Sequence, residues 1–109
     1  MDAPLGELGR YTGPATLILS SLAGGPKHGY ALTKDVEQFS GVKLSPGTLY
    51  AALSRLVDQK LIEPVASEDE RRRPYRITAL GSAALRSQLS EQRRVADVGL
   101  GRLEGLVTP

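Results

Sequence analysis

The sequence predicts a mainly α-helical chain with one small β-hairpin. Apolar residues recur at three- and four-residue spacing in four segments, which is the periodicity of one face of a helix. Two short strand candidates flank a polar stretch, as the strands of a hairpin do. Glycine and proline separate the helical segments, since glycine ends helices and proline cannot continue one. The predicted order is therefore helix, helix, helix, hairpin and long helix.

Composition limits the range of functions. The 109 residues suit one domain, and a net charge of +2 is too small by itself to indicate nucleic acid. The absence of cysteine excludes a disulfide framework, a cysteine-based zinc site and a thiol nucleophile. The chain does not open with a basic start followed by an apolar run, and its longest apolar stretch, Ala15–Leu22, is too short to span a membrane. We therefore expect a cytoplasmic protein that does not enter membranes.

The first helix is predicted to begin near Thr12, which can cap it, with Pro14 in the first turn. The residues before it, 1–10, are predicted to form a flexible segment. Gly24, Gly25 and Pro26 end the helix. Its apolar residues are Ala15, Leu17, Ile18, Leu19 and Leu22.

The second helix is predicted from His28 or Gly29 to about Ser40. His28 is the only histidine, and a single histidine without surrounding carboxylates does not make a metal site. A packing or capping role for His28 is therefore favoured, and no metal site is predicted. The apolar face of this helix comprises Ala31, Leu32, Val36 and Phe39.

The third helix has the clearest start signal. Ser45 can accept hydrogen bonds from the first free amides, and the fixed φ of Pro46 suits the first helical position. The helix is predicted to run to about Lys60. Its apolar stripe comprises Leu49, Ala52, Leu53 and Leu56.

A short twisted hairpin is predicted next. Its strands are Leu61–Val65 and Tyr75–Thr78, and the tip between them carries three acidic residues and three arginines. Pro64 and Pro74 restrict these strands to edge positions or strand ends.

The last third of the chain is predicted to be a long helix that Thr78 can cap. Gly99, Gly101 and Gly105 weaken its end, so fraying is expected there unless a partner holds it. The apolar residues near a seven-residue pattern are Leu85, Leu89, Ala96, Leu103 and Leu106. A core this small cannot cover so much apolar surface, and we expect a second copy of the chain to bury it.

The start of the third helix has the chemistry of a phosphate contact. Gly47 puts no side chain at the second helical position, so another backbone can come close. The free amides and the positive end of the helix dipole attract phosphate, and Thr48 and Tyr50 add hydroxyl donors. Arg55 and Lys60 extend positive charge along the same helix. A well-capped core helix without any ligand is the alternative interpretation.

Several motifs together resemble the PadR family of transcriptional regulators. They are Gly25–Leu32 (GPKHGYAL), Leu44–Tyr50 (LSPGTLY), Leu56, Leu61–Glu63, and Arg72–Thr78 (RRPYRIT) with Gly81. The resemblance covers about residues 14–90, and the single helix after Thr78 is similar to the small subfamily. It implies a winged helix-turn-helix fold, a homodimer, and repression from a palindromic operator that is often flanked by ATGT and ACAT half-sites. It also implies relief of repression by a small-molecule effector in many members, although the sequence assigns no effector-binding residue.

The resemblance divides the chain into a DNA-binding domain at residues 11–78 and a C-terminal dimerisation helix at residues 79–109. The DNA-binding residues that the resemblance and the positions of the basic residues together indicate are Tyr30, Lys34, Ser45, Gly47, Thr48, Tyr50, Arg55, Arg71, Arg72 and Arg73. Tyr30 would instead pack on the first helix if it were a partly buried aromatic residue. The three arginines would instead form a solvated turn if Glu68–Glu70 neutralised them.

The interpretation that follows is a homodimeric transcriptional regulator of double-stranded DNA. No catalytic constellation and no cofactor motif are found, so the chain is not expected to be an enzyme. A winged-helix module that binds another protein, and has lost its affinity for DNA, is the alternative. The small net charge and the acidic hairpin tip keep that alternative open.

Overall fold

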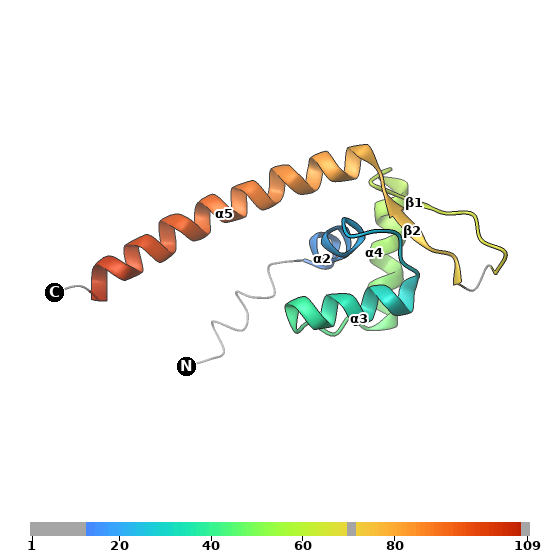
Figure 1. Ribbon diagram of the computed structural model, residues 1–109, viewed down its shortest axis with the longest axis horizontal. Helices are drawn as coiled ribbons and strands as arrows, with labels where there is room; N and C mark the ends of the chain where they lie inside the picture. The colour runs from blue at the N-terminus through green and yellow to red at the C-terminus, as the bar shows by residue number, and fades with distance from the viewer. Residues whose placement is uncertain (1–12, 70–71, 108–109) are drawn as a thin grey trace.

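A computed structural model describes residues 13–69 and 72–107. Its helices and strands follow in the order α2 (Pro14–Leu22), α3 (Gly29–Ser40), α4 (Pro46–Asp58), β1 (Ile62–Pro64), β2 (Tyr75–Ile77) and α5 (Ala79–Val107). Figure 1 shows α2, α3 and α4 packed together, the hairpin on one side of them, and α5 leaving on the other side. The predicted mainly helical fold with one small hairpin is confirmed.

The hydrophobic core lies where α2, α3 and α4 meet. Ile18, Leu32 and Val36 have no exposed surface. Every residue of the predicted apolar stripe of α4 is buried, because residues at three- and four-residue spacing share one helix face. Ile62 from β1 and Leu85 from α5 join the same core, so the hairpin and the long helix are anchored on the three-helix unit.

Two element boundaries differ from the predictions. Gly13, without a side-chain hydrogen bond, is the N-cap of α2, and Thr12 lies outside the described residues. Helix α4 ends at Asp58, before Lys60, whose φ of 63° is incompatible with a continuing helix. Helix α5 includes its three late glycines and runs to Val107.

Phe39 was expected on the buried face of α3, but it is 52% exposed. Its spacing does place it on the same face as Leu32 and Val36, which are the buried residues of this helix. The core, however, ends near Val36, one turn earlier on α3, so no other element that the structure describes covers Phe39 at the end of this face.

The hairpin is a two-stranded antiparallel sheet in which Ile62 pairs with Ile77, and Pro64 with Tyr75. Each strand is shorter than predicted. One residue of the α2–α3 loop, Lys27, forms an additional antiparallel bridge to Tyr75. We call the segment 62–77 the wing, of which residues 62–69 and 72–77 are described.

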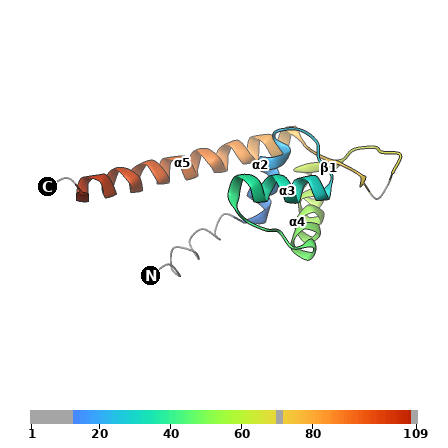
Figure 2. The same cartoon turned by 60° about the horizontal axis from the view of Figure 1, so that its bottom comes forward.

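Helix α5 contains 29 residues, and at about 1.5 Å per residue it is roughly 43 Å long. Figure 2 shows it extending well beyond the three-helix unit. From Arg86 to Leu106 every residue is exposed, although several are large and apolar. Among the helices that the structure describes, none combines the length and the apolar character needed to cross a membrane.

Candidate nucleic-acid interface

The start of α3 carries two of the predicted DNA-binding residues. His28 is the N-cap, and its Nδ1 accepts a hydrogen bond from the amide of Ala31 (3.4 Å), so the capping role is confirmed. Tyr30 is 68% exposed and therefore does not pack on α2 as a partly buried aromatic residue would. The Nζ of Lys34, one turn later on the same face, lies 5.5 Å from the centre of the Tyr30 ring.

Helix α4 starts with the cap expected from the sequence. The Oγ of Ser45 accepts a hydrogen bond from the amide of Thr48 (3.2 Å) and donates one to the Oγ1 of Thr48 (2.9 Å). Gly47 is exposed, and a Cβ added there would meet no atom within 4 Å. The surface at this helix start is therefore open, and Thr48 is held at its edge.

Tyr50 brings the two helix starts together. Its hydroxyl oxygen lies 3.0 Å from the position that a Cβ on Gly29 would occupy, although the residue as a whole is 57% exposed. Neither α3 nor α4 has an acidic residue in its first turn. The start of α3 thus lies beside the Tyr50 side chain of α4, and no acidic residue in either first turn weakens the attraction of these positive helix ends for an anion.

A groove of about 570 Å³ runs between the start of α2 and α4. Thr48 and Arg55 line the α4 side, and Pro14 lines the α2 side. Thr48 and Arg55 are seven residues apart, which places them on one face of α4. Arg55 is exposed, so its charge is available on the same side of the helix as the open start at Gly47.

Two of the three predicted DNA-binding arginines of the wing lie within the described residues. Arg72 and Arg73 are exposed, whereas Arg71 lies outside the described residues. Nearer the body, the guanidinium of Arg76 contacts Oε1 of Glu63 through Nε (2.9 Å) and Nη2 (2.8 Å). This cross-strand pair offsets the charge of Arg76, and the described part of the tip holds Glu68 and Asp69 as well as Arg72 and Arg73.

The residues predicted for dimerisation divide into two groups. Leu85 is only 6% exposed and belongs to the core of its own protomer, which leaves it little surface for a second copy. Leu89, Ala96, Leu103 and Leu106 are exposed. Leu100, which the sequence analysis did not name, is also 60% exposed and lies four residues after Ala96 on the same face.

The sequence analysis also did not single out Lys27, whose backbone pairs with Tyr75, or Gly81, which the Leu61 carbonyl approaches closely. Both lie inside recognised motifs, but neither shows an apolar period or an exposed charge run that would single it out. These contacts join residues that are far apart in the sequence.

Within the described ranges, no group of three or more histidine, cysteine, aspartate or glutamate residues could hold a metal ion.

Comparison with known proteins places this geometry in a family. The model of the transcriptional regulator PadR-like family matches residues 18–87, which include α3, α4 and the wing. The chain belongs to the PadR-like family. Proteins of this family are transcriptional regulators and not enzymes, so both of these expectations are confirmed.

Two curated proteins and a solved structure illustrate the similarity. Transcriptional regulator Rv3488 of Mycobacterium tuberculosis is 40% identical over 82 residues, covering 73% of this chain and 72% of that protein. A PadR family transcriptional regulator from Eggerthella lenta is 33% identical with a TM-score of 0.73, covering 94% of this chain and 89% of that one. A 37.1 kDa protein in transposon TN4556 of Streptomyces fradiae is 41% identical over 80 residues, or 73% of this chain, but this PadR-like chain spans only 23% of its length.

Proposed function

We propose that this PadR-like chain is a homodimer that binds a palindromic operator in double-stranded DNA and represses transcription. The observation that carries the proposal is the meeting of the α3 and α4 starts at Tyr50, with exposed hydroxyls and no acidic residue in either first turn. Phosphate is the group that such a surface attracts. Because the bacterial relatives keep their DNA in the cytoplasm, we expect this chain to act there.

Helix α4 is the recognition helix in this proposal. Gly47 lets the DNA backbone approach the helix start, while Thr48 and Tyr50 donate hydrogen bonds to phosphates or base edges. In the arrangement described above, Thr48 accepts the hydrogen bond from Ser45, so its own hydroxyl proton can be donated to DNA. Arg55, which lines the groove between α2 and α4, would add a further DNA contact along α4.

Helix α3 and the wing supply contacts on either side. Tyr30 and Lys34 lie on one exposed face of α3 and would bind the phosphate backbone beside the major groove. Arg71, Arg72 and Arg73 would contact the adjacent minor groove or its phosphates, since a narrow minor groove attracts arginine.

The dimer is proposed to form through α5. All residues from 86 to 106 are exposed, and one face combines Leu89, Ala96, Leu100 and Leu103. A second copy would bury this face, because long amphipathic helices pair along such a seam. The two α4 helices must then lie about 34–36 Å apart to enter successive major grooves. Residues 11–78 and 79–109 are accordingly proposed as the DNA-binding and dimerisation parts.

Relief by a small-molecule effector is proposed at the joint between these parts. A hollow of about 270 Å³ lies between the end of α2, the wing and the first turns of α5, and its lining includes Ala23, Ile77 and Leu89. A ligand there would change the direction of α5 and with it the spacing of the recognition helices. Such a ligand should lose its effect in Ala23→Leu, which fills the hollow, while operator binding persists.

The test of DNA binding is fluorescence anisotropy with a duplex from the promoter upstream of the gene, compared with a scrambled duplex at two salt concentrations. We expect tight, sequence-preferring binding that weakens as salt rises, because each neutralised phosphate releases counterions. Tyr50→Phe removes one hydroxyl with little change of shape and should weaken binding further. Equal, weak binding to both duplexes would remove the operator from the proposal and favour a protein-interaction module.

A further inference from the structure

Lys27 is the residue of the α2–α3 loop that contacts both the three-helix unit and the wing. Its backbone pairs with Tyr75 of β2 in both directions: its amide donates to the Tyr75 carbonyl (3.1 Å), and the Tyr75 amide donates to its carbonyl (2.9 Å). This pair adds Lys27 to the outer side of β2 as a single residue of a third strand. The backbone of Lys27 is therefore bonded to the wing.

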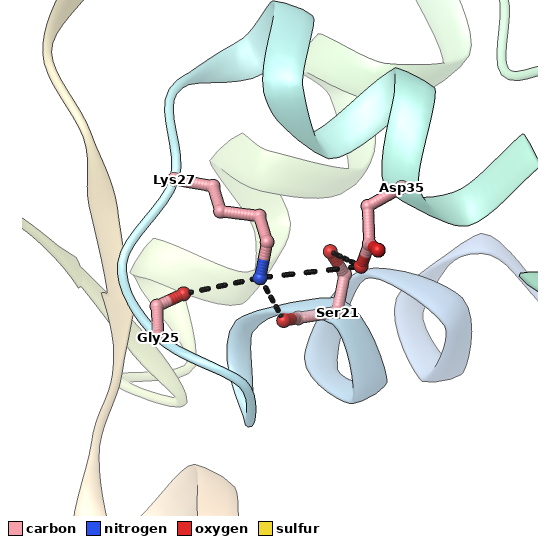
Figure 3. Close-up of polar contacts among 4 residues, drawn as sticks. All are labelled: Ser21, Gly25, Lys27 and Asp35. Carbon is pink, nitrogen blue, oxygen red and sulfur yellow. Dashed lines mark hydrogen bonds and ion pairs between the residues drawn. The ribbon is translucent and has the colours of Figure 1, made fainter. Parts of the chain in front are cut away.

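The side chain of Lys27 points the opposite way, into the junction of α2 and α3 (Figure 3). Its Nζ donates to the carbonyl oxygen of Ser21 (2.5 Å), lies 3.4 Å from the carbonyl oxygen of Gly25, and lies 3.9 Å from Oδ2 of Asp35. The same Oδ2 accepts a hydrogen bond from Oγ of Ser21 (2.6 Å), and Ser21 is only 2% exposed. The ammonium group thus joins the last turn of α2 to the middle of α3.

The charge of Lys27 is already directed at protein oxygens. Its side chain is only 22% exposed, and three oxygens lie within hydrogen-bond or ion-pair distance of the Nζ. By contrast, Lys34 on the neighbouring helix is exposed and faces the ring of Tyr30. A lysine held in this way is poorly placed to bind a phosphate, although its residue type would suit one.

We propose that Lys27 is a positioning residue that holds the wing in a defined place relative to α3 and α4, so that the wing and the recognition helix contact DNA together. Only the expected effect of Lys27 on DNA affinity rests on the proposed operator binding. The coupling of the wing to the helices through Lys27 is a property of the free protein. Lys27→Met keeps the unbranched side chain but removes the ammonium group. It should therefore loosen the wing without removing a DNA contact.

The first measurement is amide hydrogen exchange of the full chain without DNA. In Lys27→Met, the amides of Lys27 and Tyr75 should exchange about tenfold faster or more, because the bridge between them opens locally. The amides of Val65 and Thr78 pair with Pro74 and Leu61 elsewhere at the wing, and they should keep their rates. Unchanged exchange at Tyr75, or equal acceleration at all four amides, would overturn the proposal.

Lys34→Met is the matched control, since it removes an exposed lysine from α3 and should leave the exchange of Tyr75 unchanged. Should Lys27→Met fail to fold, Asp35→Asn removes one charge from the cluster while keeping its shape, and it should accelerate the same two amides to a smaller extent. No acceleration in that variant would contradict the role of the cluster. Lys27→Arg retains the positive charge and donors and should restore slow exchange.

The second measurement is the dependence of operator affinity on salt. Lys27→Met should weaken binding severalfold but leave the slope of log affinity against log salt unchanged, because no phosphate contact is lost. Lys34→Met should lower the magnitude of that slope by about 0.9. If Lys27→Met lowered both the affinity and the magnitude of the slope, as Lys34→Met is expected to do, Lys27 would be a phosphate contact and the inference would be overturned.

The two measurements separate the two proposals. If the parent chain binds no operator while Lys27→Met still accelerates exchange at Tyr75, the proposed function fails and the coupling stands. If the parent chain binds its operator and Lys27→Met changes neither exchange nor affinity, the positioning role fails and the function stands. A double variant with Arg72→Ala adds a further check, since the losses should be less than additive if Lys27 acts through the wing.

Discussion

The carbonyl oxygen of Leu61 occupies the space that a side chain on Gly81 would need. A Cβ built on Gly81 would overlap that oxygen and would lie only 2.9 Å from Cγ1 of Ile77. Thr78 strengthens the same contact, because its amide donates to the Leu61 carbonyl (3.0 Å) and its Oγ1 accepts from the amide of Gly81 (3.0 Å). The first turn of α5 is thereby docked directly onto the residue that precedes β1.

Gly81→Ala should therefore destabilise the protein, although alanine is the better helix former. The methyl group would push against backbone rather than against a flexible side chain, and we expect a loss of about 2 kcal/mol or more. Thermal unfolding should show this as a Tm lower by several degrees. The matched control is Gly101→Ala, where a Cβ meets nothing within 4 Å and a gain of about 0.5–1 kcal/mol is expected. An unchanged or higher Tm for Gly81→Ala would contradict the close contact.

Ser45→Ala should cost about 1 kcal/mol of stability, because it removes the side chain that caps the amide of Thr48 (3.2 Å). Urea unfolding with an unchanged m-value measures this directly. Ser54→Ala is the control, since Ser54 is an exposed serine inside the same helix and should be neutral or slightly stabilising. Equal effects of the two substitutions would mean that the cap contributes nothing.

Gly29→Ala should weaken operator binding while leaving the Tm almost unchanged. The new Cβ would lie 3.0 Å from the hydroxyl oxygen of Tyr50, and the far end of an exposed side chain can move away at little cost. The displaced hydroxyl would then miss its DNA partner. Anisotropy should show a loss of affinity in the parent chain but no further loss when the alanine is added to Tyr50→Phe. Equal losses of affinity in both backgrounds would show that Gly29→Ala does not act through the Tyr50 hydroxyl.

Leu103→Glu should convert the proposed dimer into a monomer, because it places a charge in the apolar seam of α5. Val98→Glu is the matched control: Val98 is also apolar and exposed (47%), but five residues along a helix place it about 140° away from Leu103. Sedimentation equilibrium should find a monomer for the first variant and a dimer for the second. A dimer in both cases would move the interface away from this face.

Much of the local structure follows from residues close together in the sequence. Ser45 and Thr78 cap α4 and α5, as predicted, because a cap needs only a side-chain oxygen and an amide three residues later. The shared apolar face of α4 follows from spacing alone, since the helix repeat determines which residues share a face. The motifs around these caps were also sufficient to indicate the family.

Burial at the edges of the core could not be predicted in the same way. Phe39 and Leu85 both fit an apolar period, yet Phe39 is exposed and Leu85 is buried within its own protomer. Periodicity states which way a residue faces along its helix. It does not state whether another element lies there to cover it.

The sequence by itself determined where α3, α4 and α5 begin, which faces of the helices are apolar, and that a short hairpin precedes the last helix. Only the tertiary structure decided that Lys27 bridges α2, α3 and the wing, that Gly81 must leave room for Leu61, and that Tyr50 joins the starts of α3 and α4. The physical reason is the range of the interactions. Caps and helix faces depend on neighbours within one or two turns, whereas these contacts join residues that come together only when the elements pack.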